Sequence, residues 1–461
     1  MLFFVLTGAV NPFCKWVCPR LALSSRDLVV VYVMMIVASA IPTWGLVTNL
    51  FHILTRPIYY ATPENNWVDT LLPLLPSWLA PREPAVARFF YEGLPAGAGG
   101  IPWRAWFVPM LAWGTFMIAV FLWMVATMII FRRPWVERER LTYPLTQLPL
   151  EMIRGSDDHM VPPLFRSGLM WAGFCLPFII QFTRGLHHYY FFLPELTTLF
   201  DPVYLFRNSV RMIVFVNFSI IGLSYFLSLQ VSFSVWFFHL LARTQTGVFN
   251  LIGYEIKGHN ESLTGSSVAL SHQGMGAMLA LVGAMLWTSR DHLRRVVTAA
   301  TRREGDGDDA DEILSYRATA WLWLGCLIYI AGWLLATGLP PLAMVVFLVG
   351  SFVIFLAIAR VIAQGGVGFT SSTMLPQPFT VYTLGTDLIG WKGLASTGLS
   401  YSWAAEMRTT VMASSANGLK LISGHSLRSH RVFWAIVLAI VTGLVVASWT
   451  TLHLNYTYGG I

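Results

Sequence analysis

Eight stretches of this chain are long and apolar enough to cross a lipid bilayer, and this feature limits the possible folds most. A crossing helix needs about 20 mostly apolar residues, because the hydrocarbon core is roughly 30 Å thick. Only 11% of the 461 residues are charged, against about 25% in soluble domains. The sequence therefore predicts an all-α, polytopic transmembrane helix bundle of about 8–10 spans. The stretches are residues 28–54, 103–131, 167–183, 211–241, 266–288, 318–337, 339–362 and 431–452.

Clusters of basic residues predict which loops lie in the cytoplasm. The net charge is +7, and in a polytopic membrane protein Lys and Arg mark cytoplasmic loops rather than a nucleic-acid partner. The clusters lie within residues 15–26, 132–154 and 290–317. If all of them are cytoplasmic, the number of crossings between residues 154 and 290 must be even, although only three apolar stretches lie there.

The stretch 211–241 offers a way to make that number even. It has about 31 residues, half as many again as one crossing needs, and residues 228–234 in its middle include three serines and a glutamine. We predict a break at 228–234 that gives two crossings or a re-entrant turn. Such a break lines a cavity, because non-helical backbone inside a bilayer needs cover from protein or water. One long, tilted helix is the alternative.

Three other segments have a composition unlike that of a spanning helix, and we place all of them in one integral membrane domain, residues 1–461. Residues 363–404 hold seven glycines, two prolines and only two charges, which predicts a broken or re-entrant segment; an extracytoplasmic loop folded against the bundle is the alternative. Residues 55–102, rich in proline and aromatics, should form an extracytoplasmic cap, as a connector on the headgroups or as a gate. Residues 289–317 should form a cytoplasmic loop, whose acidic part, 304–312, we expect to be solvated.

The segment 132–140, RRPWVERER, carries charges of both signs directly after a predicted span. Anchoring at an anionic cytoplasmic leaflet is sufficient to explain it. A gate made by ion pairs is the alternative.

The sequence contains no motif of a nucleotide-driven pump or a hydrolase. It has no phosphate-binding loop and no His-Glu-x-x-His zinc motif, so we predict neither an enzyme nor a resident cofactor or metal. A coupled carrier needs only polar groups in the membrane and, if protons drive it, a group that titrates.

Polar residues inside or beside the apolar stretches are the candidates for such a path. We expect His272 and Gln273 to be central, because small residues follow them and allow close approach of a helix or ligand. For each residue alone, contact with headgroups or a backbone carbonyl is the simpler explanation. The substrate-path candidates are His272, Gln273, Gln230, His239, Asn217, Arg360 and Gln364, and the gating or coupling candidates are Arg184, His187, His188, Glu406 and Arg408.

Four segments resemble a known family: YATPEN at 60–65, the run RRPWVERERLTYPLTQLPLEM at 132–152, FSVWFF at 233–238 and SHQGMG at 271–276. Together they are similar to an uncharacterised bacterial family of polytopic membrane proteins that is distantly related to the oligopeptide transporter (OPT) superfamily. The resemblance implies a secondary carrier in the bacterial inner membrane that moves small peptides or metal chelates with protons. It also implies that relatives extend beyond both ends of this chain, which would then be truncated.

Two other functions stay open at this point. The chain would also suit a structural or cofactor-binding membrane subunit of a larger complex, or a homo-oligomer, with aromatic faces that bind pigments, quinone or partner helices. An intramembrane enzyme on lipid-linked substrates would use His187, His188, Glu195 and Asp201 as acid and base groups.

Overall fold

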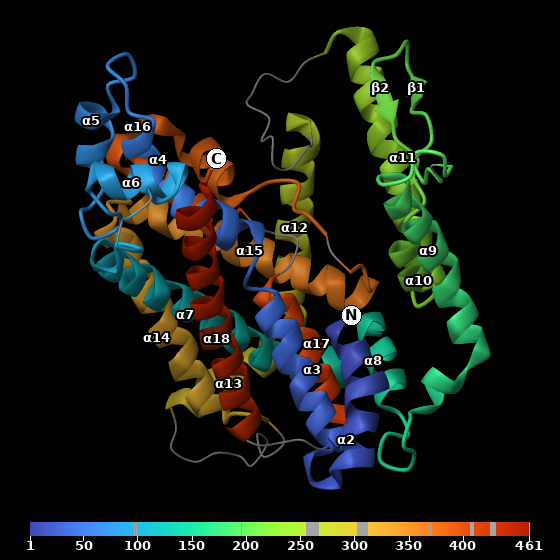
Figure 1. The fold of residues 1–461 in the computed structure, drawn as a ribbon. Coiled ribbons are helices and arrows are strands. Elements are labelled where there is room, and N and C mark those ends of the chain that lie inside the picture. Colours follow the sequence, from blue (N-terminus) through green and yellow to red (C-terminus); the bar gives the residue numbers. More distant parts are fainter. Residues whose placement is uncertain are drawn as a thin grey trace.

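The computed structural model describes all residues except 96, 98, 195, 255–266, 302–311, 369, 406–409, 425–429 and 461. The predicted all-α fold is confirmed (Figure 1). Two short strands, β1 (Val203–Leu205) and β2 (Val210–Met212), pair antiparallel with Tyr204 opposite Arg211. The α-helices are α1 (Leu2–Val5), α2 (Asn11–Val17), α3 (Ser25–Ser39), α4 (Phe51–Tyr59), α5 (Trp67–Thr70), α6 (Pro84–Glu92), α7 (Trp103–Arg133), α8 (Gln147–Ile153), α9 (Gly168–His187), α10 (Phe218–Ser224), α11 (Leu229–Ile252), α12 (Val268–Thr288), α13 (Arg290–Thr301), α14 (Tyr316–Ala336), α15 (Pro341–Gly365), α16 (Pro376–Leu399), α17 (Val411–Gly424) and α18 (His430–Tyr458). Short π or 3-10 segments are η1 (Leu6–Val10), η2 (Pro19–Leu21), η3 (Trp44–Leu50), η4 (Leu72–Leu74), η5 (Pro134–Arg138), η6 (Pro144–Thr146), η7 (Pro163–Arg166) and η8 (Ser400–Ser402).

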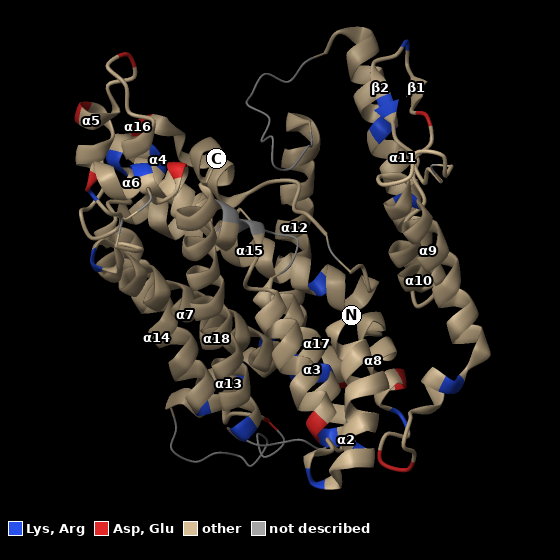
Figure 2. Ribbon diagram, viewed as in Figure 1, with Lys and Arg blue, Asp and Glu red and all other residues tan. Residues whose placement is uncertain are grey.

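Six of the eight predicted stretches are helices long and apolar enough to cross a membrane. Within the described residues these are α7, α9, α12, α14, α15 and α18. Figure 2 shows that charged residues gather near the ends of α7, α14 and α18 and leave their middles uncharged. The protein is therefore a membrane protein. The other two stretches are interrupted helices.

The stretch 28–54 breaks after α3. Proline at position 42 has no backbone N–H, and it disfavours helical backbone at the residue before it. Helix α3 ends at Ser39, Thr43 is extended with φ −90° and ψ 174°, and η3 and α4 follow. Helix α3 packs against α17, and its last residue, Ser39, is exposed.

The stretch 211–241 is interrupted just before the predicted position 228–234, but it does not form two crossings. It begins in β2, α10 has only seven residues, and neither α10 nor α11 is among the spanning helices of the described residues. Helix α10 ends at Ser224 and α11 begins at Leu229, with the Ser228 side chain accepting a hydrogen bond from the Val231 N–H. The chain reverses direction between α10 and α11. As a result, Asn250 near the end of α11 lies beside β2 and donates to the Ser209 carbonyl, 3.4 Å away. The break lies at the start of the polar segment 228–234, so that the rest of that segment is helical.

The glycine-rich segment 363–404 contains a broken helix, α16, rather than only a loop folded against the bundle. Helix α15 ends at Gly365, and Gly366 follows with φ 64°. Helix α16 is interrupted at Gly385 and Gly390, where φ is 78° and 67°. These positive φ angles favour glycine, which explains the glycine content that the sequence shows here.

Helix α7 forms the centre of the packed bundle. It contacts α14, α17 and α18, and most of its side chains are buried. Its aromatic rings join rings of other helices, so that the rings of Phe116 and Trp333 stack with centroids 4.0 Å apart. One buried hydroxyl of the same helix is bonded to a neighbouring helix: Trp323 Nε1 donates to Thr127 Oγ1 at 3.0 Å.

The basic segments lie together at one end of the bundle, in agreement with their predicted common side. Lys15 donates to the carbonyls of Ser156 and His159, and the Ser25 N–H donates to Asp157 at 2.8 Å. The described part of residues 55–102 forms the opposite end, where α6 contacts α18, α4 packs against α6, and α5 packs against α4 (Figure 1). The acidic stretch 304–312 differs from the prediction at its last residue, because Glu312 is buried in an ion pair; residues 304–311 lie outside the described part.

Residues 168–254 form an arm beside this bundle (Figure 1, green). It consists of α9, β1, β2, α10 and α11, and it comes close to the bundle where Leu223 and Val231 approach Gly368 and Gly365. No residue of α9 is buried inside the protein, although the helix is apolar. The arm therefore presents its apolar side chains to lipid or to another protein.

Candidate functional site

A cavity lies between the interrupted helices. We call it the polar cavity because six of its eleven lining residues have polar side chains, although most of its wall is apolar. It has a volume of about 200 Å³ and is lined from α3, η6, the C-terminal turn of α15, and the first turns of α17. The lining residues are Tyr32, Ile36, Ser39, Leu145, Thr146, Ile362, Gly368, Thr410, Ala413, Ser414 and Asn417.

Two helical stripes face each other across this cavity. Tyr32, Ile36 and Ser39 follow one face of α3 at a spacing of four and three residues, and Thr410, Ala413 and Asn417 do the same along α17. Side chains at this spacing point to one side of a helix. Gly418 allows the two helices to approach, since a Cβ there would lie 2.9 Å from the Val33 side chain.

Asn417 leaves a hydrogen-bond acceptor unused in the cavity wall. The side chain is only 7% exposed. Its Nδ2 donates to the Ala413 carbonyl at 3.0 Å, whereas its buried Oδ1 has no partner. Buried polar atoms are nearly always paired, so the unpaired Oδ1 of this lining residue marks a place where a hydrogen-bond donor is missing.

The ends of two helices add partial charges to the same cavity. Thr410 Oγ1 accepts the Ala413 N–H at 3.1 Å and caps α17, whose N-terminal end therefore carries partial positive charge. Ser39 is the last residue of α3, whose C-terminal end carries partial negative charge. The cavity thus has a partially positive side at α17, which favours hydrogen-bond acceptors of a solute, and a partially negative side at α3, which favours its donors.

A charged cluster adjoins the cavity through α15. Arg360 pairs with Glu139 and its Nε donates to Gln364 Oε1 at 3.2 Å. The Arg360 guanidinium also lies over the Trp135 ring, 5.4 Å from its centroid. Its Nη1 is buried without a partner. The cluster therefore holds the Arg360 cation and the Glu139 anion, and the Nη1 group of Arg360 remains as a donor for a further group.

Tyr143 joins this cluster to the cavity. Its N–H donates to the Ala363 carbonyl at 3.0 Å, and Thr146, in the cavity wall, donates its hydroxyl to the Tyr143 carbonyl at 2.7 Å. Tyr143 adopts a left-handed backbone with φ 44°, which costs about 1–3 kcal/mol for a residue other than glycine. Burial raises the pKa of its phenol, and the Lys420 ammonium lies 5.9 Å from its ring centroid. Strained residues of this kind cluster at functional sites.

The comparison with known families covers the whole chain. Residues 1–461 match a family of unknown function, DUF6785. The chain belongs to that family. No curated protein and no solved structure matches it.

Two of the residues predicted from the sequence, Arg360 and Gln364, belong to the charged cluster and do not line the cavity. Arg360 and Gln364, four residues apart on α15, bond to each other beside the cavity. His272 and Gln273, expected to be central, are exposed on α12 and do not line the polar cavity. His272 Nδ1 lies 2.9 Å from the Val268 carbonyl, and its ring lies edge-on to Tyr382.

The remaining candidates do not converge on the cavity. Asn217 caps α10 by accepting the N–H groups of Ser219 and Ile220, which satisfies its side chain locally. Within the arm, His187 Nδ1 lies 2.7 Å from the Leu193 carbonyl, which explains this side chain without a ligand. Gln230, His239, Arg184, His188 and Asp201 are exposed on the arm. Glu406, Arg408 and Glu195 lie outside the described residues.

The sequence prediction missed the polar stripe of α17. Residues 411–424 are too short for a spanning helix, so they were not treated as part of the transmembrane bundle. The missed signal is the spacing of Thr410, Ser414 and Asn417, at four and three residues, in a segment of small side chains.

Proposed function

We propose that this membrane protein is a secondary carrier whose substrate binds in the polar cavity between α3 and α17. The observation that supports this most is the buried, unpartnered Asn417 Oδ1 in a wall that combines five hydroxyl-bearing residues with apolar side chains. The cavity is several times the volume of a water molecule in the liquid, about 30 Å³, which leaves room for the polar end of a small solute. The OPT-like resemblance adds the substrate class, small peptides or metal chelates, and the bacterial inner membrane.

Coupling to protons is the second part of the proposal. The described residues that line the cavity include no Asp, Glu, His, Lys or Arg, so the proton-binding group must lie beside it. We assign this role to Glu139, which pairs with Arg360 and has a side chain 24% exposed. Protonation of Glu139 would release Arg360, and a released guanidinium can bind a carboxylate of the substrate.

Uptake into proteoliposomes tests the substrate site. The full chain is reconstituted, and entry of radiolabelled dialanine is measured with the outside more acidic than the inside. We expect Asn417→Leu to lower the uptake rate by roughly tenfold, since one lost hydrogen bond to a charged or polar ligand costs about 1.5 kcal/mol. Gln273→Leu, an equivalent change on the exposed face of α12, serves as the control. Uptake by Asn417→Leu at the wild-type rate would contradict the proposed site.

A membrane subunit of a larger complex is the second candidate function. It is favoured by the arm, residues 168–254, on which aromatic side chains such as Phe178, Phe182 and Trp236 are more than half exposed. Chemical cross-linking in native membranes tests it. Cross-links from the arm to another polypeptide would support a subunit, and cross-links confined to this chain would favour the carrier.

A further inference from the structure

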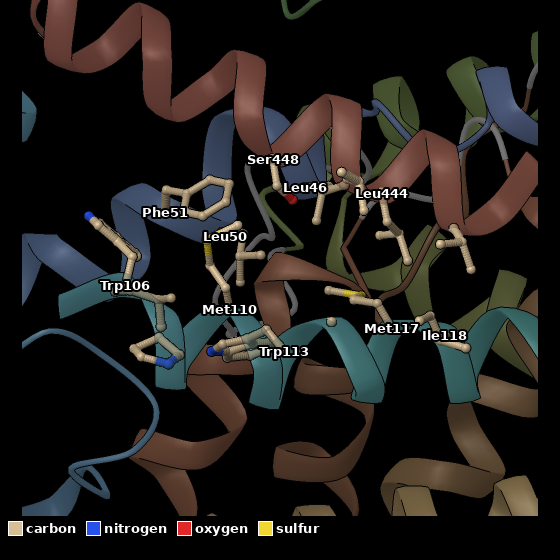
Figure 3. A pocket seen from close by; sticks show the side chains of 15 residues that line it. Leu46, Leu50, Phe51, Trp106, Met110, Trp113, Met117, Ile118, Leu444 and Ser448 are labelled. Atoms are coloured by element: carbon tan, nitrogen blue, oxygen red, sulfur yellow. The ribbon is translucent and has the colours of Figure 1, made fainter. Parts of the chain in front are cut away.

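A second cavity lies on the other side of the bundle, between η3 and α4, α7, and α18. Its volume is about 140 Å³. Figure 3 shows α7 and α18 on opposite sides of it, with Leu46, Leu50 and Phe51 between them. It shares no lining residue with the polar cavity at α17, so it is a separate site.

The wall of this cavity offers almost nothing to a polar ligand. Of its lining side chains, Ser448 alone carries a hydroxyl. The two indole N–H groups are already used, since Trp106 Nε1 donates to the Tyr456 hydroxyl at 2.8 Å and Trp113 Nε1 to the Leu79 carbonyl at 3.1 Å. An apolar cavity of roughly 150 Å³ in a soluble protein stays dry and binds benzene. This cavity therefore favours an apolar occupant over water.

The cavity also reaches the outer surface of the bundle. Val445 lines it and is 61% exposed. It lies on α18, one of the helices long and apolar enough to cross a membrane, opposite α7, which is another. At this depth the surrounding medium is lipid, so the groups at the opening are hydrocarbon chains.

We infer that this cavity binds the acyl chain of a membrane lipid. The chain enters between α7 and α18 at Val445 and packs against Met110, Met117 and Leu444. Methionine suits such a contact, because its flexible thioether adapts to irregular apolar ligands. The inference is independent of the carrier function.

Gly114 gives a sharp test because it lines the cavity and a Cβ added there meets no atom within 4 Å. Gly114→Phe therefore places a ring in the cavity without a backbone clash. Gly325→Phe is the matched control: Gly325 lies on α14, has equally open space, and does not line the cavity.

The probe is a phosphatidylcholine with a diazirine in the middle of its acyl chain, mixed into vesicles of phosphatidylethanolamine and phosphatidylglycerol. The reconstituted full chain is irradiated, and cross-linked peptides are mapped by mass spectrometry. We expect labelling concentrated on residues 110–118 and 441–448, reduced by roughly tenfold in Gly114→Phe and unchanged in Gly325→Phe.

Two results would overturn the inference: labelling of residues 110–118 in Gly114→Phe at the wild-type level, or wild-type labelling spread evenly over all lipid-facing helices. If Gly114→Phe cannot be purified in a folded state, Val445→Trp narrows the opening from the exposed side. The same decrease at residues 110–118 is then expected, and its absence would likewise overturn the inference.

Discussion

Arg132 and Glu312 are 180 residues apart in the chain and form a bidentate ion pair, with both N···O distances 2.6 Å. Both side chains are almost completely buried, at 4% and 1% exposed. Tyr316 donates its hydroxyl to the same carboxylate at 3.3 Å. The pair fastens the end of α7 to the residues just before α14, so the segment 132–140 forms ion pairs within the protein. A gating role of these pairs stays a prediction.

Removal of Arg132 should destabilise the protein strongly. In Arg132→Ala the Glu312 carboxylate stays buried without its cation, and breaking a buried pair in this way costs about 3–5 kcal/mol. Thermal unfolding in detergent measures the effect as a lower melting temperature. Arg88→Ala is the control, because Arg88 and Glu92 form an exposed pair at 4.0 Å and such pairs contribute little. Equal melting temperatures for the two variants would contradict the prediction.

Gly366→Ala should also destabilise the fold, for two reasons. Its φ of 64° costs about 1–2 kcal/mol for a residue with a Cβ. That Cβ would also lie 2.5 Å from the Pro144 Cβ, which forces η6 away from α15. Gly276→Ala on α12 is the control, since its Cβ meets no atom within 4 Å and alanine favours a helix. We expect a lower melting temperature for Gly366→Ala alone.

His292 should make stability depend on pH. The ring is 1% exposed and its Nε2 lies 2.9 Å from the Ile130 carbonyl. Burial, together with the nearby cations Arg295, Arg138 and Arg133, lowers the pKa of His292 to about 4 from 6.5. The unfolded chain therefore binds a proton between pH 6.5 and 4 that the folded protein does not, and stability falls as pH decreases through this window.

The size of this effect follows from the same pKa values. The difference between pKa values of 6.5 and about 4 corresponds to a loss of roughly 3 kcal/mol in the free energy of unfolding at the acid end of this pH window. Melting temperatures between pH 7.5 and pH 4 measure it, with His292→Gln as the comparison because glutamine does not titrate. The wild-type curve should fall more steeply than the variant curve. Parallel curves would contradict this origin of the pH dependence.

The breaks in the helices were predictable because each has a local cause. Serines in an overlong apolar stretch indicated the interruption before α11, and glycines indicated the kinks at Gly385 and Gly390. The proline that ends α3 was equally visible, although the prediction treated 28–54 as continuous. Local rules of this kind depend only on neighbouring residues, so one sequence is enough to apply them.

The site depended instead on contacts that no single stretch contains. Arg360 and Gln364 were identifiable as polar residues on an apolar helix, and their spacing of four residues brings them together. That Glu139 is the ion-pair partner of Arg360 follows only from the tertiary fold, which sets η5 and its flanking turn against α15. Asn417 was missed because its helix is short, and its importance comes from the facing stripe on α3.

Glu139→Gln should remove the pH dependence of uptake if Glu139 is the proton-binding group. Glutamine keeps the shape of the side chain but neither binds nor releases a proton, so Arg360 no longer alternates between a paired and a released state. In the wild type we expect uptake of dialanine to rise as the outside is acidified, and in Glu139→Gln to change little over the same range. Initial rates in proteoliposomes at several external pH values measure this.

Glu137→Gln provides the matched control for that experiment. Glu137 lies two residues earlier, is 41% exposed, and pairs with Arg132 and Arg133 rather than with Arg360. Its neutralisation alters the same charged segment without touching the cluster beside the cavity, so its pH profile should follow the wild type. A purely structural role of Glu139 would lower the uptake rate equally at every pH. A pH profile of Glu139→Gln that keeps the wild-type shape would therefore remove Glu139 from the proposed coupling.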